Sequence, residues 1–346
     1  MSIPSRTATV RRRPRRSRVL VALATAATLA LAGCSGDAET PAEEEGPEAQ
    51  GTAEGMTLSG RWPLTGLPAS GAAPEHPVMV VKIDNTSSSS PQLGLGKSDL
   101  IVEELVEGGS TRLAVFYYSQ LPKKVGPVRS MRATDIGIVQ PAEAVLVASG
   151  GAPQTVRRIG SAGIKTFGEG APGYARDSGR SAPYNLMMEL PKLADRLQQP
   201  EPPEDYLPWG SEDDLPQGQP ARSLTAQFSG GHTTSWQFKG GTYENLNSFA
   251  AAGDRFRPAT VLVLRVPVGD AGYRDPAGNP VPETKLTGKG DAMVFHDGRL
   301  VRGTWSKDGL ASALQLRTKA GELTLPPGKV WIELVPRDGG NVTFSK

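Results

Sequence analysis

Short apolar runs separated by glycine, proline and serine mark the strands expected in the first half of the folded chain. The runs are rich in β-branched and aromatic residues, which favour strands. They cover residues 78–83, 100–107, 112–118 and 144–149. Three further segments are predicted to be short helices: 130–139, 153–159 and 189–197. The pattern therefore predicts a mixed α/β module at residues 59–197.

The second half, residues 221–346, is predicted to be a β-rich module. Val261–Val268 is its strongest strand, and the run 292–305 contains Asp297-Gly298, a pair that favours the type I′ turn of a hairpin. Polar and apolar residues alternate here, as expected when one face of a sheet meets water. Two more segments are predicted to complete a meander: 314–325 and 329–336. We therefore assign the whole fold to the α+β class.

Two segments lack the apolar residues needed to build a core. Residues 198–220 are acidic and rich in proline, which predicts a linker or long surface loop between the two modules. Residues 34–58 begin with the only cysteine, Cys34, and are also acidic and poor in apolar residues. Such a stretch cannot bury enough surface to offset the entropy lost on ordering, so it is predicted to be a disordered tether.

The first 33 residues have the features of a bacterial signal peptide. Seven arginines precede an apolar run from Val19 to Gly33, which is shorter than the ~20 residues that span a bilayer. The sequence Leu31-Ala32-Gly33-Cys34 resembles a lipobox, and this resemblance implies that Cys34 carries a diacylglycerol, with acyl chains such as palmitate. The alternative is a plain secretory signal with an incidental cysteine. Both the general secretory and the twin-arginine export routes stay open.

Removal of the signal changes the sign of the net charge. The full chain has 38 basic and 36 acidic residues, for a net charge of +2. Without the seven arginines of the signal, 31 basic residues face 36 acidic ones, and the net charge is −5. The basicity of the full chain is therefore a targeting feature, and the sequence favours the membrane, through the lipid on Cys34, over nucleic acid as a partner.

The stretch from Glu103 to Arg112 combines three carboxylates with one arginine inside a predicted hairpin. Residues two apart share a face of a strand, so Glu103 and Glu107 lie on one side and Glu104 on the other. A two-residue turn at Gly108-Gly109 would place Glu107 opposite Ser110, Leu105 opposite Arg112 and Glu104 opposite Leu113. We therefore expect Arg112 to join Glu103 and Glu107 in a structural cross-strand ion network.

Glu104 then has only apolar neighbours on its own hairpin. A buried carboxylate must find a partner elsewhere or its pKa rises, as a general acid requires. The following loop offers partners in Arg129 and Arg132, on either side of Ser130, which is predicted to cap the next helix. Two arginines at a helix N-terminus are compatible with an anion-binding site or with internal salt bridges to Glu104 and Glu107.

Other polar residues are candidates for the lining of a cleft. Arg180, Tyr184 and Asn185 lie in a long predicted loop, and Asp84 and Asn85 close the first strand; the alternative is an ordinary surface loop and a turn cap. The three histidines are scattered, with no metal-ligand spacing and no nucleotide-binding motif, so neither a metal nor a cofactor is expected.

Several of these motifs together resemble the YerB-like bacterial lipoproteins, a two-module family of unknown function. The matching stretches are KIDN, SDLIVEELVEGGSTR, VGPVRSMR, RSAPYN and GKVWIELVP, spread over about residues 62–340. The resemblance implies an exported, lipid-anchored protein with an α/β N-terminal and a β-rich C-terminal module. It implies no activity. The resemblance singles out six positions in the matching motifs, without implying a role for any of them: Glu104, Glu107, Arg112, Gly126, Arg129 and Arg132.

Two functions fit the sequence. The favoured one is a membrane-anchored, extracytoplasmic binding or scaffolding protein whose arginine-rich cleft takes an anionic or carbohydrate-like ligand of the cell envelope, such as peptidoglycan, or an envelope protein. The alternative is an enzyme that cleaves cell-wall glycan by a lytic route, with Glu104 as general acid and base. No feature of the sequence sets an oligomeric state.

Overall fold

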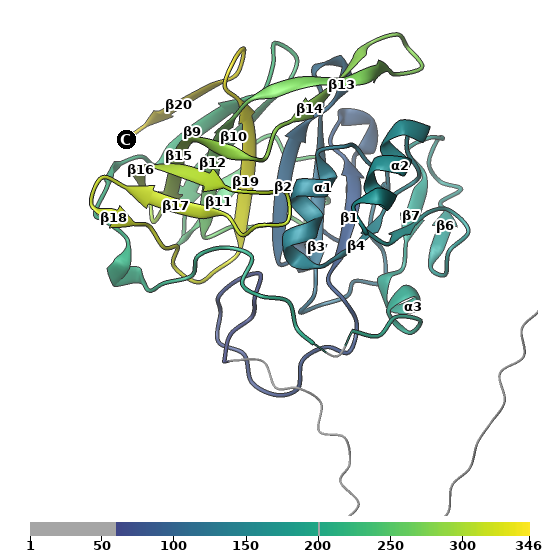
Figure 1. Ribbon diagram of the computed structural model, residues 1–346, viewed down its shortest axis with the longest axis horizontal. Coiled ribbons are helices and arrows are strands. Elements are labelled where there is room, and N and C mark those ends of the chain that lie inside the picture. The colour runs from purple at the N-terminus through teal and green to yellow at the C-terminus, as the bar shows by residue number, and fades with distance from the viewer. Residues whose placement is uncertain (1–59, 200) are drawn as a thin grey trace, which may run out of the picture. The chain divides into compact units, whose positions relative to one another are not determined.

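Strands from both halves of the chain join in one twelve-stranded sheet in the computed structural model, which describes residues 60–199 and 201–346 (Figure 1). The strand order is β18-β17-β16-β15-β12-β19-β2-β3-β1-β4-β5, with β8 paired to β16. The predicted signal peptide, Cys34 and the tether lie outside the described residues. The described part is rich in strands with three short α-helices, which agrees with an α+β fold.

The first half contributes seven strands and all three α-helices of the described residues. Its elements are β1 (Met79–Asp84), β2 (Leu100–Leu105), β3 (Thr111–Tyr117), α1 (Asp135–Val139), β4 (Val145–Val147), α2 (Pro153–Ser161), β5 (Thr166–Phe167), β6 (Tyr174–Arg176), β7 (Leu186–Met188) and α3 (Leu190–Ala194). Its 3-10 helices are η1 (Ser87–Ser89), η2 (Leu95–Lys97), η3 (Glu107–Gly109) and η4 (Gln140–Ala142). The four apolar runs predicted as strands correspond to β1, β2, β3 and β4.

The second half is made of strands after one 3-10 helix, η5 (Glu212–Asp214). The strands are β8 (Gln219–Pro220), β9 (Ser223–Gln227), β10 (Thr233–Lys239), β11 (Thr242–Asn245), β12 (Thr260–Val266), β13 (Val268–Arg274), β14 (Pro280–Thr284), β15 (Gly288–His296), β16 (Arg299–Lys307), β17 (Gln315–Thr318), β18 (Gly321–Glu322), β19 (Val330–Pro336) and β20 (Asn341–Ser345). The predicted type I′ turn is confirmed: Asp297 and Gly298 have φ of 45° and 67°, and His296 pairs with Arg299.

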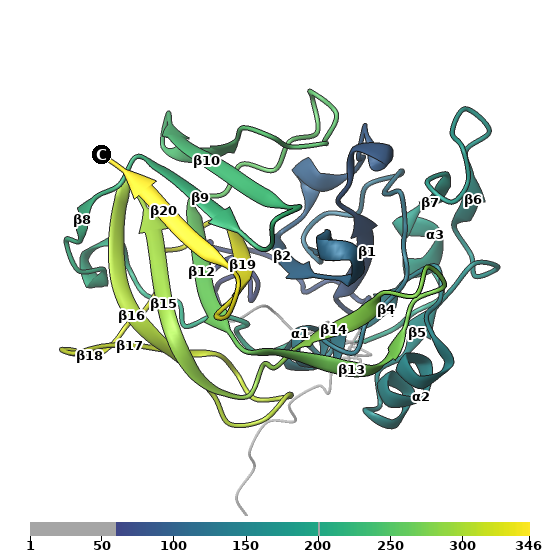
Figure 2. The same ribbon diagram turned by 90° about the horizontal axis from the view of Figure 1, so that it is seen from above.

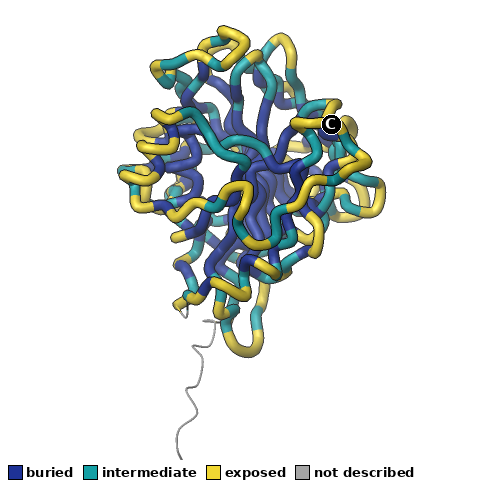
Figure 3. Tube along the Cα trace, turned by 90° about the vertical axis from the view of Figure 1, so that its right-hand side faces the viewer, coloured by how far each residue is buried: buried dark blue, intermediate teal, exposed yellow. Residues whose placement is uncertain are grey.

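Two apolar cores cover opposite faces of the main sheet. One face carries Val80, Val102 and Ala114 and packs against α1, α2 and the segment that contains Trp209. The other face packs against α3 and the small sheet β11-β10-β9-β20. Strands in the middle of the sheet are consequently buried on both faces, as the dark central strands of Figure 3 show.

The position of β19 differs from the predicted meander. This strand does not follow β18 in the sheet but lies between β12 and β2, parallel to both (Figure 1). All seven of its residues are buried, so this strand does not have the solvent-exposed face that was predicted. A strand that is parallel to its neighbours and covered on both faces needs a continuous apolar run, and Val330–Pro336 is nearly that. The pairing of β19 with β2 joins the sheet strands of the first half to those of the second.

The hairpin β13–β14 leaves the second half and runs across the first (Figure 2). Its Tyr273 hydroxyl lies 2.8 Å from the Thr155 hydroxyl of α2, and Glu283 accepts two hydrogen bonds from Arg158 of α2 at 2.9 and 2.6 Å. We refer to Val268–Thr284 as the arm. Its contacts with α2 place a segment of the second half beside the arginine-rich loop of the first.

Candidate functional site

The charged residues of the predicted hairpin gather at one end of β1, β2 and β3. The turn between β2 and β3 spans more than the predicted two residues: Val106 donates its N–H to the carbonyl of Ser110 at 2.8 Å, and Gly108 and Gly109 both have positive φ. Leu105 therefore pairs with Thr111. The predicted register was wrong by one residue, and every residue of β3 lies on the opposite face from the one expected.

This shift places Arg112 directly opposite Glu104 on β2 and opposite Asp84 on β1. All three side chains share the face that carries Val80 and Val102, while Glu103 lies on the other face. The expected network of Arg112 with both Glu103 and Glu107 therefore does not form as predicted. Arg112 contacts Glu107 alone of the two, with a distance of 3.1 Å between NH2 and Oε1.

Glu104 is paired with a lysine from the neighbouring strand rather than with an arginine. Lys82 on β1 donates to Glu104 Oε1, and its Nζ lies 2.6 Å from Asp135 Oδ1 of α1; all three side chains are fully buried. Burial, opposed by the charge of Lys82 and reinforced by that of Asp135, raises the pKa of Glu104 to about 7. Glu104 Oε2 has no hydrogen-bond partner among the described residues. One cation thus serves two buried carboxyl groups.

Glu107 receives the guanidinium groups of two arginines. Arg132 donates to both of its carboxylate oxygens, through Nε at 2.8 Å and through NH2, while Arg112 also donates through NH1 to the carbonyl of Ser130 at 2.9 Å. Burial would raise the pKa of Glu107, but the hydrogen bond from Arg132 and the two positive charges outweigh it and lower the pKa. Burial and the charge of Arg132 lower the pKa of Arg112 to about 10. Arg112 Nε has no acceptor among the described residues.

Arg129 completes the arginine cluster, by which we mean Arg112, Arg129 and Arg132. Its Nε donates to Asp84 Oδ2 at 3.1 Å, and its guanidinium carbon lies 5.1 Å from the ring centroid of Tyr184. Three arginines are therefore balanced by two carboxylates, Asp84 and Glu107. The cluster by itself holds one more positive charge than its two carboxylates, and the adjacent buried group holds one more carboxyl group than its single cation, Lys82.

The helix predicted from Ser130 begins five residues later, at Asp135. Ser130 is not its cap, so Arg129 and Arg132 do not flank a helix N-terminus, and that part of the prediction was wrong. Asp135 instead accepts the backbone N–H of Arg132 at 2.7 Å through Oδ2. The loop from Val128 to Thr134 is held by these side-chain contacts and by the backbone bond from Arg129 N–H to the Lys82 carbonyl at 2.8 Å.

Three other predicted residues lie apart from the cluster. Asn85 lies on the opposite face of the sheet and donates to Glu103 Oε1 at 2.9 Å. Arg180 donates to the carbonyls of Ser89 and Pro91, and Asn185 accepts a hydrogen bond from Arg176 at 2.7 Å. The contacts of Arg180 and Asn185 stabilise surface loops, whereas Asn85 belongs to the buried polar group around Glu103.

A hollow of about 490 Å³ opens beside the arginine cluster. We call it the arm hollow. It is lined by Ser130 and Arg132, by the start of α2, and by the tip of the arm, where Arg274 is exposed. Its size lies within the range of roughly 300–1,000 Å³ typical of small-ligand sites. The arm hollow is thus a recess beside Arg132, formed by both halves of the chain.

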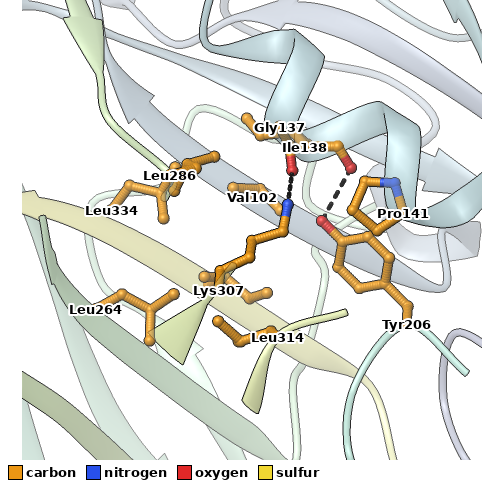
Figure 4. Close-up of a pocket in the computed structure, with 11 residues that line it drawn as sticks. Val102, Gly137, Ile138, Pro141, Tyr206, Leu264, Leu286, Lys307, Leu314 and Leu334 are labelled. Carbon is orange, nitrogen blue, oxygen red and sulfur yellow. Dashed lines mark hydrogen bonds between the residues drawn. The ribbon is translucent and has the colours of Figure 1, made fainter. Parts of the chain in front are cut away.

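Two other hollows are poorer candidates. The one between α1 and β16 holds only about 30 Å³, enough for a water molecule. Lys307 fills its polar side by donating to the carbonyl of Gly137 at 2.6 Å, as Figure 4 shows, and to that of Leu310 at 2.6 Å. Burial lowers the pKa of Lys307 to about 8. A hollow of about 430 Å³ near Glu143 and Lys165 has the right size but lies away from the arginine cluster.

Sequence reasoning missed a second polar cluster on the other face of the sheet. Glu103 is fully buried and its Oε1 lies 2.8 Å from His232 Nε2, while Glu333 of β19 is its register partner. Lys82 was missed as well, because it lies inside the apolar run MVVKID. In both cases the sequence signal was a charged residue within a strand that is otherwise apolar on both faces.

The described residues, 60–199 and 201–346, contain neither a cluster of metal-ligating side chains nor a membrane-spanning helix. No group of three or more His, Cys, Asp or Glu side chains there has the geometry of a metal site. No helix in this part is long and apolar enough to cross a membrane.

Comparison with protein families shows which family the chain belongs to. Residues 64–202 match the model of the N-terminal domain of DUF3048, described as a protein of unknown function, and residues 224–332 match the model of its C-terminal domain. The chain belongs to the DUF3048 family. It is 24% identical over 293 residues to "Putative lipoprotein YerB" of Bacillus subtilis (strain 168), covering 79% of this chain and 86% of that protein.

A solved structure has the same fold. The crystal structure of the YerB protein from Bacillus subtilis matches with a TM-score of 0.68 at 20% identity, over 82% of this chain and 99% of that one. At this identity the match shows the fold alone. The resemblance to YerB-like proteins expected from the motifs is confirmed.

Proposed function

We propose that this DUF3048 protein is a lipid-anchored, extracytoplasmic binding protein whose arm hollow takes an anionic or carbohydrate-like ligand of the cell envelope. The observation that carries the proposal is a pair of guanidinium groups, those of Arg132 and Arg274, in the lining of a recess of ligand size. Anchoring through Cys34 is supported by the lipobox-like sequence and by the similarity to the Bacillus subtilis protein that is named a putative lipoprotein.

Charge and geometry favour an anion in the arm hollow. Arg132 lines the hollow while its guanidinium is fixed by Glu107, so it would meet a ligand already oriented. Arg274 contributes a second guanidinium from the arm, next to the one carboxylate of the lining, that of Asp275. A carboxylate or phosphate bound there could accept hydrogen bonds from both guanidinium groups.

The alternative, a glycan-cleaving enzyme, has less support. A general acid must come within hydrogen-bonding reach of the bond it cleaves. Glu104 has a suitably raised pKa, but its side chain is fully buried behind Lys82 and does not line any of the three hollows described above. Acid catalysis would require the sheet to open.

The test is sedimentation of the intact chain, in detergent, with purified peptidoglycan. Arg274→Gln removes an exposed guanidinium from the arm hollow without disturbing a buried pair, and about tenfold weaker binding is expected. Arg317→Gln is the matched control, because Arg317 is equally exposed on β17, outside the hollow. Equal binding by both variants and the unchanged chain would reject the arm hollow as the site. Release of soluble fragments would favour the enzyme instead.

A further inference from the structure

Two buried glutamates meet where the halves of the chain join. Glu103 of β2 and Glu333 of β19 are register partners on adjacent parallel strands, and both are fully buried. Adjacent strands lie about 4.8 Å apart, so two carboxylates at this spacing would repel strongly in a dry interior. At least one of them must be neutral or be balanced by a cation.

The hydrogen bonds around the two carboxyl groups differ sharply. Glu103 accepts bonds from four side chains: Asn85 at 2.9 Å, Thr111 at 2.7 Å, Thr234 at 3.0 and 3.1 Å, and His232 at 2.8 Å. Hydrogen bonds from four donor side chains favour the ionised form of Glu103. Burial raises the pKa of Glu103, but the hydrogen bonds and the charge of His232 outweigh burial and lower this pKa overall.

Glu333 has the opposite surroundings. Trp236 donates to its Oε1 at 2.7 Å, while Oε2 accepts no hydrogen bond from the described residues and is free to carry a proton towards Glu103. Burial, followed by the charge of Glu103, raises the pKa of Glu333 well above its usual value. The pair is therefore arranged to hold one proton, on Glu333.

The positive charge of this group comes from one histidine. His232 precedes β10, and burial would lower its pKa, but the hydrogen bond and charge of Glu103 raise it. The remaining polar neighbours, from β3, β10 and the residue after β1, are uncharged: Thr111, Thr234, Trp236 and Asn85. Lys82, Glu104 and Arg112 belong to the opposite face of the sheet.

We propose that Glu103, Glu333 and His232 form a proton-dependent latch across the joint between β2 and β19, closed while the two carboxyl groups share one proton and loosened when that proton leaves. Loss of the proton would leave two adjacent carboxylates with at most one cation. The two strands that carry them belong to different halves of the chain. Proton loss thus weakens the strand pairing that unites the sheet.

The sign of the pH effect follows from linkage. Because folding raises the pKa of Glu333, its contribution to stability is complete below the unfolded value, 4.5, and is lost as the pH rises towards the folded value. Each proton held only by the folded state makes the unfolding equilibrium constant rise tenfold per pH unit. His232 acts in the same direction above its ordinary value of 6.5.

The test compares the unchanged chain with Glu333→Gln, in which an amide replaces the neutral acid. Unfolding in urea is followed between pH 5 and 9, and above pH 5 the ratio of unfolding constants, unchanged chain over variant, should rise up to tenfold per pH unit. Parallel profiles would overturn the latch. A variant that fails to fold would also overturn it, because a neutral group would then not suffice at this position.

Two local measurements separate the latch from general stability. The infrared difference spectrum, unchanged chain minus Glu333→Gln, should contain a buried carboxylic-acid C=O stretch, because the acid band of Glu104, whose pKa is about 7, is common to both chains and cancels. Hydrogen exchange of the amides of β2 and β19 should accelerate with pH more in the unchanged chain than in the variant, after correction for intrinsic rates. Glu104→Gln, one residue along β2 but on the opposite face, is the matched control. It should keep the Glu333 stretch, and above pH 8, where Glu104 with its pKa of about 7 is ionised, its exchange should accelerate as in the unchanged chain. Absence of the acid band from the difference spectrum would refute the shared proton.

Discussion

Glu104 and Arg112 lie directly opposite each other on β2 and β3, yet each takes its counter-charge from a different residue. Glu104 is held by Lys82, and Arg112 by Glu107 and the carbonyl of Ser130. The charged end of the sheet therefore divides into a fully buried group around Lys82 and a partly exposed group around Glu107. The first group bears on stability and the second lies beside the arm hollow.

Lys82→Met should destabilise the chain strongly. The substitution leaves Glu104 and Asp135 buried without their shared cation, and removal of one partner from a buried ion pair costs about 3–5 kcal/mol. Urea unfolding at pH 7 measures the loss. Lys192→Met breaks an exposed pair with Glu189 and is the control, with an expected change of about 0–1 kcal/mol. A similar small change for both variants would show that Lys82 does not hold these carboxylates.

Glu104→Gln should change how stability depends on pH. Folding raises the pKa of Glu104 from 4.5 to about 7, so its contribution is complete below pH 4.5 and is lost as the pH rises through 7. Between these limits the unfolding free energy of the unchanged chain should fall relative to the variant by up to about 1.4 kcal/mol per pH unit. Unfolding curves at pH 5, 6 and 7 provide the measurement. A difference that is constant over this range would mean that Glu104 stays ionised.

Glu107→Gln should destabilise the arginine cluster and create a stronger anion site. Arg112 and Arg132 lose their shared carboxylate, at a cost of about 2–4 kcal/mol. Inorganic phosphate should recover part of this loss in thermal unfolding, because it can replace the missing charge. The exposed Arg176–Glu169 pair supplies the control: Glu169→Gln should gain nothing from phosphate. Equal gains in both variants would indicate a general salt effect.

Gly298→Ala should destabilise the β15–β16 hairpin more than Gly272→Ala destabilises the arm. Both glycines have positive φ, which costs an alanine about 1 kcal/mol. At Gly298 an added Cβ would also lie 2.9 Å from the Phe238 ring, whereas at Gly272 it would meet nothing within 4 Å. The thermal unfolding temperatures of the two variants provide the comparison. Equal losses would mean that the Phe238 ring moves aside without cost.

Cys34→Ser should release the chain from the membrane. Stable anchoring requires more than one acyl chain, and the serine variant could not receive the thioether-linked pair. Fractionation of cells followed by detection of the chain measures its distribution, with the unchanged chain as the reference. A variant that stays entirely in the membrane fraction would contradict anchoring through Cys34.

The sequence predicted local structure better than it predicted the side-chain contacts between residues that are distant in the chain. The apolar runs that become β1, β2, β3 and β4, and the turn at Asp297-Gly298, depend on residues that are close in the chain, and they were found. The register of β2 on β3 was missed because glycine allows several turn lengths, and one extra residue moves a whole strand to the other face. The pairs of Lys82 with Glu104 and of Glu103 with Glu333 are long-range, so no local pattern encodes them.

The place of β19 has a consequence for the order in which the chain can fold. Synthesis proceeds from the N-terminus, so β2 and β3 exist long before the ribosome reaches residues 330–336. Until then one edge of β2 offers unpaired backbone groups, and a bare edge strand invites pairing with other chains. The edge of β2 on the β19 side therefore stays open to association with other chains until residues 330–336 have been made.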